Sequence, residues 1–78
     1  MKTMTCEQLG GACDVTFSSE TFDDIGAQCK AHNMEMFKKM DPAHMKAITS
    51  MMALMAKPTE FQEWLAGKRA EFDALPED

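Results

Sequence analysis

The chain has 78 residues, and its 8 basic and 13 acidic side chains give a formal net charge of −5. Hydrophobic residues at 45% and charged residues at 27% describe an ordinary globular chain, neither disordered nor membrane-spanning. The acidic balance argues against binding to nucleic acid. We expect one domain, residues 1–78. A chain this short buries only roughly 60% of its unfolded surface, so a metal, a disulfide or a partner chain is expected to stabilise it.

The N-terminus and the cysteines indicate the compartment. The opening MKTMTCEQLG has no apolar segment of the kind found in secretory signals, so we expect a cytoplasmic protein without membrane contact. Persistent disulfides are rare there, and with three cysteines a Cys6–Cys13 bridge would leave Cys29 unpaired. The cysteines are therefore expected to be metal ligands, reactive thiols or small buried side chains.

The first 18 residues predict a β-hairpin. Residues 1–6 and 13–18 are short alternating segments rich in Thr, Val and Phe, and Gly10–Gly11 marks a turn between them. Alternation gives each strand one apolar face. The apolar face of the hairpin is expected to contain Met4, Cys6, Cys13, Val15 and Phe17.

Three helices are expected after the hairpin. The helices and the tail are expected to span 21–39, 42–57, 59–74 and 75–78. Thr21 and Thr59 each precede a polar side chain by three residues, the spacing of a capping box. Asp41 precedes a proline, which favours an N-cap followed by the first helical residue.

An apolar stripe on the first helix fixes the expected architecture. The stripe repeats at steps of three and four residues through Phe22, Ile25, Cys29, His32 and Met36. A two-stranded hairpin needs an apolar support, so we expect its inner face to lie on this stripe. The sequence therefore predicts a small α+β domain of order β-β-α-α-α, with the hairpin packed on two to three helices.

This packing would bring metal-ligating side chains together. Cys6 and Cys13 flank the hairpin loop on its inner face, while Cys29 and His32 lie one turn apart on the facing stripe. Three thiolates and an imidazole suit structural zinc, which would also stabilise a marginal core. We therefore predict a zinc site formed by Cys6, Cys13, Cys29 and His32. The alternative left open is that the cysteines are only small buried side chains.

His44 is a further candidate, because the second helix is expected to fold back antiparallel on the first. A rise of 1.5 Å per residue places His44 roughly 6 Å along the axis from His32 and roughly 10 Å from Cys29. His32 could then share a metal with Cys29 or with His44, whereas all three together would be strained. We expect Cys29 to be the fourth ligand and His44 to be partly exposed.

The N-terminal 40 residues also contain a specific motif. The pattern C-x-x-L-G-x-x-C-D occupies residues 6–14, and it is accompanied by MKTMT before it, ETFDDI at 20–25 and AH at 31–32. In these features the chain resembles an uncharacterised domain family of predicted small metal-binding proteins. The longer ending, with the second and third helices, looks like a variant of that family.

The resemblance implies metal ligation. By position in the motif, the implied ligands are Cys6, Cys13 and His32. The family often has a second histidine five residues after the first, where this chain has Phe37. The resemblance therefore leaves the fourth ligand to Cys29, His44 or water.

Other functions fit the sequence less well. Nine methionines would suit copper(I), but methionine at helical spacing usually fills cores and interfaces. A thiol enzyme needs an exposed cysteine beside a base, and the stripe is expected to be buried, so we expect no enzymatic activity. The main alternative is a metal-free module for protein interaction or self-association. The helix at 42–57 is apolar around much of its circumference, and a homodimer would cover it.

Overall fold

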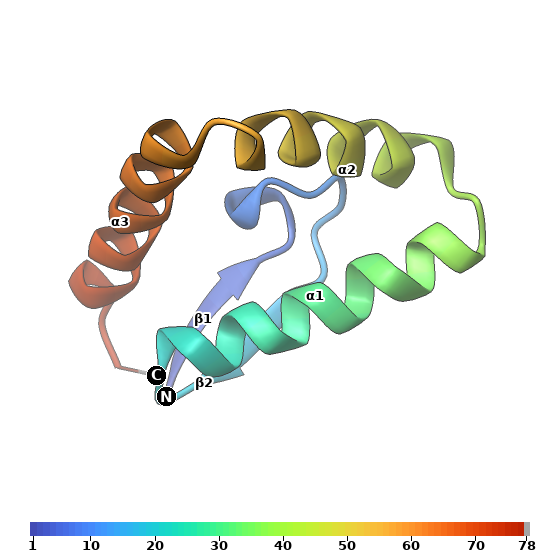
Figure 1. The fold of residues 1–78 in the computed structure, drawn as a ribbon. Coiled ribbons are helices and arrows are strands. Elements are labelled where there is room, and N and C mark those ends of the chain that lie inside the picture. The colour runs from blue at the N-terminus through green and yellow to red at the C-terminus, as the bar shows by residue number, and fades with distance from the viewer. Residues whose placement is uncertain (78) are drawn as a thin grey trace.

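The computed structural model describes residues 1–77. The elements are β1 (Lys2–Thr5), a 3₁₀ helix η1 (Glu7–Leu9), β2 (Thr16–Ser19), α1 (Phe22–Lys38), α2 (Pro42–Met55) and α3 (Pro58–Ala74). An antiparallel hairpin followed by three helices confirms the predicted α+β fold. Figure 1 shows the helices following one another around the hairpin, with α1 crossing in front of it, α2 above it and α3 at its left. Within residues 1–77, no helix combines the length and apolar character needed to cross a membrane.

The hairpin is shorter than the sequence predicts. β1 and β2 pair antiparallel with Met4 opposite Phe17, and both side chains are buried on the same face. Cys6 turns into η1 instead of continuing the strand, and the strand pairing extends no further than Thr16. Val15 is 41% exposed, so its predicted place on the apolar face is wrong. The alternation of faces does not hold where the chain leaves extended geometry.

Side-chain caps begin two of the three helices. Thr21 and Asp41 each accept the backbone N–H three residues later, at 3.1 and 2.9 Å, as predicted. α3 begins at Pro58, so the predicted cap at Thr59 is wrong. Proline is favoured as the first helical residue, because its φ is already helical and its missing N–H would have no helical partner.

The hydrophobic core lies between the hairpin and the first half of α1. Phe22, Ile25 and Cys29 of the predicted stripe are buried in it, so the stripe faces the hairpin as expected. Phe72 attaches α3 to this core through an edge-on contact with the Phe22 ring at 5.8 Å between centroids. The full core consists of Met4, Cys6, Leu9, Phe17, Phe22, Ile25, Cys29 and Phe72.

α2 is covered much less than α1. His44 is its one buried residue, while Met52 and Met55 are 64% and 54% exposed. The molecule measures 34 × 28 × 15 Å, and the shortest of these extents is little more than one helix diameter, about 10–12 Å. A single layer of helices cannot cover every face of an apolar helix, so part of α2 faces solvent.

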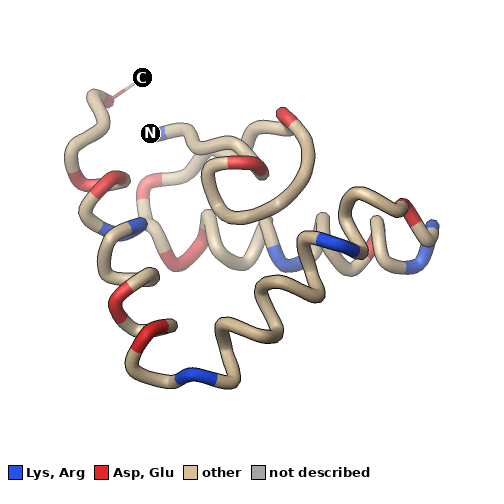
Figure 2. The backbone as a smooth tube through the Cα atoms, turned by 90° about the horizontal axis from the view of Figure 1, so that it is seen from above, with Lys and Arg blue, Asp and Glu red and all other residues tan. Residues whose placement is uncertain are grey.

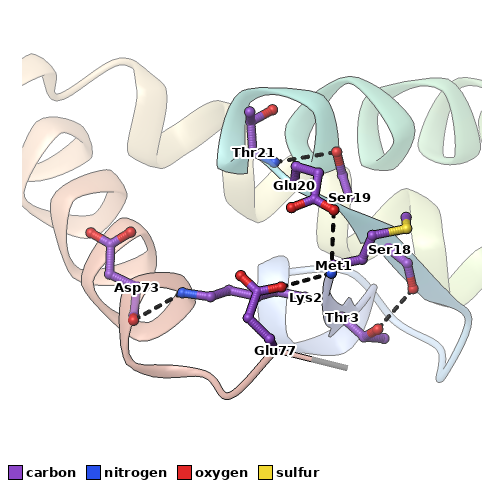
Figure 3. Close-up of polar contacts among 9 residues, drawn as sticks. All are labelled: Met1, Lys2, Thr3, Ser18, Ser19, Glu20, Thr21, Asp73 and Glu77. Atoms are coloured by element: carbon purple, nitrogen blue, oxygen red, sulfur yellow. Dashed lines mark hydrogen bonds and ion pairs between the residues drawn. The ribbon is translucent and has the colours of Figure 1, made fainter.

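The two ends of the described chain meet beside the hairpin (Figure 3). The Met1 ammonium pairs with the Glu77 carboxylate at 2.7 Å and with the Glu20 carboxylate at 3.4 Å. Lys2 Nζ donates to the backbone oxygen of Asp73 at 3.0 Å. These exposed contacts join β1 to the end of α3.

Candidate metal centre

Four potential metal ligands from separate parts of the chain meet at one point. One ligand atom from each of Cys6, Cys13, His32 and His44 lies within 4.8 Å of every other. Cys13 Sγ is 3.3 Å from His32 Nε2, and Cys6 Sγ is 3.8 Å from His44 Nε2. The two imidazole rings meet edge to face at 5.2 Å between centroids. We call these four residues the Cys2His2 cluster.

The loop between the strands holds the two thiols in place. The Cys6 N–H donates to the Val15 carbonyl at 2.8 Å, and the Glu7 N–H donates to the Cys13 carbonyl at 2.9 Å. The Gly11 N–H donates back to the Cys6 carbonyl at 2.8 Å. Backbone hydrogen bonds therefore fix the separation of the two cysteines without help from their side chains.

Gly11 makes room for the Cys6 thiol. A Cβ atom on this residue would lie 2.1 Å from Cys6 Sγ and 3.0 Å from the Cys6 carbonyl oxygen. The sequence predicts only a turn at Gly10–Gly11, and Gly10 does adopt a positive φ of 89° that favours glycine. The need for glycine at position 11 depends on the position of the Cys6 thiol, and no local sequence pattern predicts that position.

Each of the first two helices contributes one histidine. His32 of α1 is half-buried and contacts the Phe17 ring edge-on at 5.7 Å. His44 lies in the first turn of α2, and its Nδ1 is 2.6 Å from Asp41 Oδ2. Because an ionised carboxylate can only accept, Nδ1 is the donor in this contact, and Nε2 is the ring nitrogen that faces Cys6 and could bind a metal. The hydrogen bond from His44 holds the pKa of the Asp41 carboxyl below its usual value.

His44 is the fourth member of the cluster, and Cys29 lies outside it. The expectation that His44 is partly exposed is wrong, because this residue is 5% exposed. The thiols of the hairpin loop meet His32, about 4.5 Å further along α1 than Cys29, and the short turn after α1 brings the start of α2 to the same place. Sequence spacing put His44 within reach of His32 but gave no measure of its burial.

Cys29 belongs to the core. Its Sγ accepts a hydrogen bond from Asn33 Nδ2 at 3.4 Å, and Asn33 Oδ1 lies 3.9 Å from Cys6 Sγ. Asn33 therefore separates this thiol from the cluster. Burial, with a smaller effect of Cys6, raises the pKa of the Cys29 thiol to about 11, so it is protonated at neutral pH.

The surroundings of Cys6 favour a neutral thiol unless a cation is close. Burial raises the pKa of the Cys6 thiol above its usual value. A divalent cation within the cluster would reverse this effect and hold both cysteines as thiolates. The electrostatics of the cluster therefore couple thiol deprotonation to metal binding.

The dimensions of the cluster can be compared with those of a tetrahedral metal site, for which zinc is the reference. At Zn–S and Zn–N distances of about 2.3 and 2.0–2.1 Å, a sulfur and a nitrogen in a tetrahedral shell are roughly 3.6 Å apart. The Cys13–His32 and Cys6–His44 sulfur–nitrogen distances, 3.3 and 3.8 Å, lie on either side of this value. All four ligand atoms lie within 4.8 Å of one another, so the side chains would move closer together to form the shell.

Comparison with protein-family models, with curated proteins and with solved structures gives no match to this chain. The resemblance of residues 1–40 to predicted small metal-binding proteins stays a prediction from the motif. The geometry of the Cys2His2 cluster is therefore the main basis for assigning a function.

Proposed function

We propose that the chain is a non-enzymatic, cytoplasmic zinc-binding protein that holds one ion with Cys6, Cys13, His32 and His44. The observation that carries this proposal is the approach of four ligand atoms to within 4.8 Å of one another. Zinc prefers thiolate and imidazole ligands in a tetrahedral shell. Four protein ligands complete that shell, whereas catalytic zinc sites keep a position for water or substrate. The proposed role of the metal is therefore structural.

The metal would join α2 to the hairpin and α1, which already share the hydrophobic core. The two thiols belong to the hairpin loop, His32 to α1 and His44 to α2. His44 is also the one buried side chain of α2, so the metal would attach this helix to the rest of the fold. Metal binding by a small domain contributes directly to its folding free energy.

Metal content tests the proposal. We expect the full chain, purified without chelator or metal-affinity resin, to contain one zinc per chain by elemental analysis. Replacing zinc with Co²⁺ should give the visible absorption of a tetrahedral site with thiolate ligands. A folded protein that contains no zinc and binds neither added ion would overturn the proposal.

Gly11→Ala is expected to weaken zinc binding by at least about tenfold, because the new methyl group would occupy the position of the Cys6 thiol. Gly67→Ala is the matched control, since a Cβ there meets no atom within 4 Å. Alanine in a helix should leave zinc affinity unchanged and stabilise the fold by up to about 1 kcal/mol. Competition with a chromophoric chelator measures both affinities. Equal zinc binding by the two variants would contradict the role of Gly11.

Asp41→Asn is expected to weaken zinc binding by about tenfold. Asp41 Oδ2 accepts from both the backbone N–H and Nδ1 of His44, and an amide oxygen can accept the same two bonds. The substitution therefore removes only the charge that makes His44 Nε2 a stronger ligand. Asp24→Asn, in the first turn of α1, is the control for loss of an acidic residue near a helix N-terminus. Indistinguishable zinc affinities of the two variants would exclude this role for Asp41.

A further inference from the structure

An apolar groove lies between the three helices, separate from the Cys2His2 cluster. Its volume is about 590 Å³. Its walls include Met34 and Phe37 of α1, Met52 and Met55 of α2, and Phe61 and Trp64 of α3. We call this feature the helix groove. The metal site uses none of these side chains.

The edges of the helix groove are exposed apolar side chains. Met34, Phe37, Met52 and Met55 are 54–64% exposed. With a full area of roughly 200 Å² for each, these four leave on the order of 450 Å² of apolar surface in water. An apolar patch of this size is comparable to the largest patch on a typical monomer, and such patches are often functional.

The total surface of the molecule is larger than its mass predicts. A compact monomer of 8.7 kDa is expected to expose about 4,700 Å², whereas this chain exposes 5209 Å². The excess of roughly 500 Å² is similar in size to the exposed edges of the helix groove. It is also a large part of the roughly 800 Å² that each partner buries in a stable complex.

The charge pattern of the groove suits contact between two acidic chains. From Ala47 to Ala56 no residue is charged, and Figure 2 shows the part of α2 after its lysine as an uncharged stretch. Among the described residues, the groove lining includes Lys30 and Lys38 but no acidic side chain. When two copies of this acidic chain meet through a surface free of acids, no carboxylates are placed opposite one another in the contact.

We propose that the helix groove is a homodimer interface, with Met52 and Met55 of each copy inserted into the groove of the other. A twofold interface uses the same patch on both copies, so projections and a hollow must lie together on one surface. The helix groove and its exposed methionine edges meet this requirement. The acid-free lining and the excess surface support a second copy as the occupant.

Sedimentation of the chain as purified tests the dimer. We expect the wild type to sediment at twice its 8.7 kDa mass. Met52→Glu and Phe37→Glu should each weaken dimerisation by at least roughly tenfold, because they place a carboxylate in the apolar contact. Val15→Glu is the control, since this residue is 41% exposed and lies outside the groove lining. Circular dichroism and zinc content of each variant establish that the fold is retained.

A wild type that stays monomeric up to about 1 mM would overturn the dimer. A dimer insensitive to both groove variants would overturn it as well, because the contact would then lie elsewhere. Native mass spectrometry provides a third outcome: a monomer with a co-purified apolar molecule would assign the groove to a small ligand instead. The outcomes separate the two proposals: a zinc-loaded monomer would contradict only the dimer, whereas a zinc-free dimer would contradict only the zinc-binding function.

Discussion

Cys6→Ser and Cys13→Ser are expected to reduce zinc content to near zero, whereas Cys29→Ser should keep one zinc per chain. A serine hydroxyl is a poor zinc ligand, and each of the first two changes leaves three ligands in the Cys2His2 cluster. Cys29→Ser is a matched control, since it makes the same change at a buried cysteine outside the cluster. Elemental analysis of the three variants, purified in parallel, measures the difference.

The same series separates the two candidates for the fourth ligand. His44→Ala should lose zinc, because His44 Nε2 is part of the cluster. A Cys29→Ser protein without zinc, together with a His44→Ala protein that retains it, would assign the fourth position to Cys29. Such a result would contradict the arrangement of α2 against the hairpin loop. Circular dichroism distinguishes loss of a ligand from loss of the fold.

Removal of the metal is expected to lower the melting temperature by on the order of 20 °C. Zinc present at about 1,000 times its dissociation constant contributes about 4 kcal/mol to the free energy of unfolding. For a domain of this size, 1 kcal/mol corresponds to roughly 4–8 °C. Thermal unfolding with and without a strong chelator measures the change. Cys13→Ser is the control, since a chelator should not change its melting temperature.

When the metal is removed, we expect the loss of protection from hydrogen exchange to be greatest in α2. The buried His44 side chain is its main attachment near the hairpin, and the rest of the helix is half-buried or exposed. Hydrogen exchange should therefore accelerate in Pro42–Met55 more than in α1, which the core residues Phe22, Ile25 and Cys29 hold in place. Unchanged melting and exchange after chelation would exclude a structural role for the metal.

Helix starts and the apolar stripe were predictable because their signals are local. Thr21 and Asp41 cap helices through atoms three residues away, and Phe22, Ile25 and Cys29 share one face by helical geometry. These features need no knowledge of the rest of the fold. Together with the alternating segments around Gly10–Gly11, they predicted the hairpin and three helices in the correct order.

The fourth member of the cluster depends on relations that no local pattern contains. The spacing of Cys29 and His32 made them neighbours on α1, but η1 at the end of β1 redirects the loop and its thiols meet His32 instead. The burial of His44 depends on the direction that α2 takes after the short turn that follows α1. The need for glycine at position 11 likewise follows from the Cys6 thiol across the loop. These are distances between segments, and sequence spacing measures distance only along one segment.

All four members of the Cys2His2 cluster precede residue 45, and α3 contributes none of them. α3 instead attaches to the core through Phe72 and supplies Phe61 and Trp64 to the helix groove. The candidate metal cluster thus draws on the hairpin loop, α1 and α2, whereas the walls of the helix groove come from all three helices. Substitutions in α3 can therefore change the proposed contact surface without changing any residue of the Cys2His2 cluster.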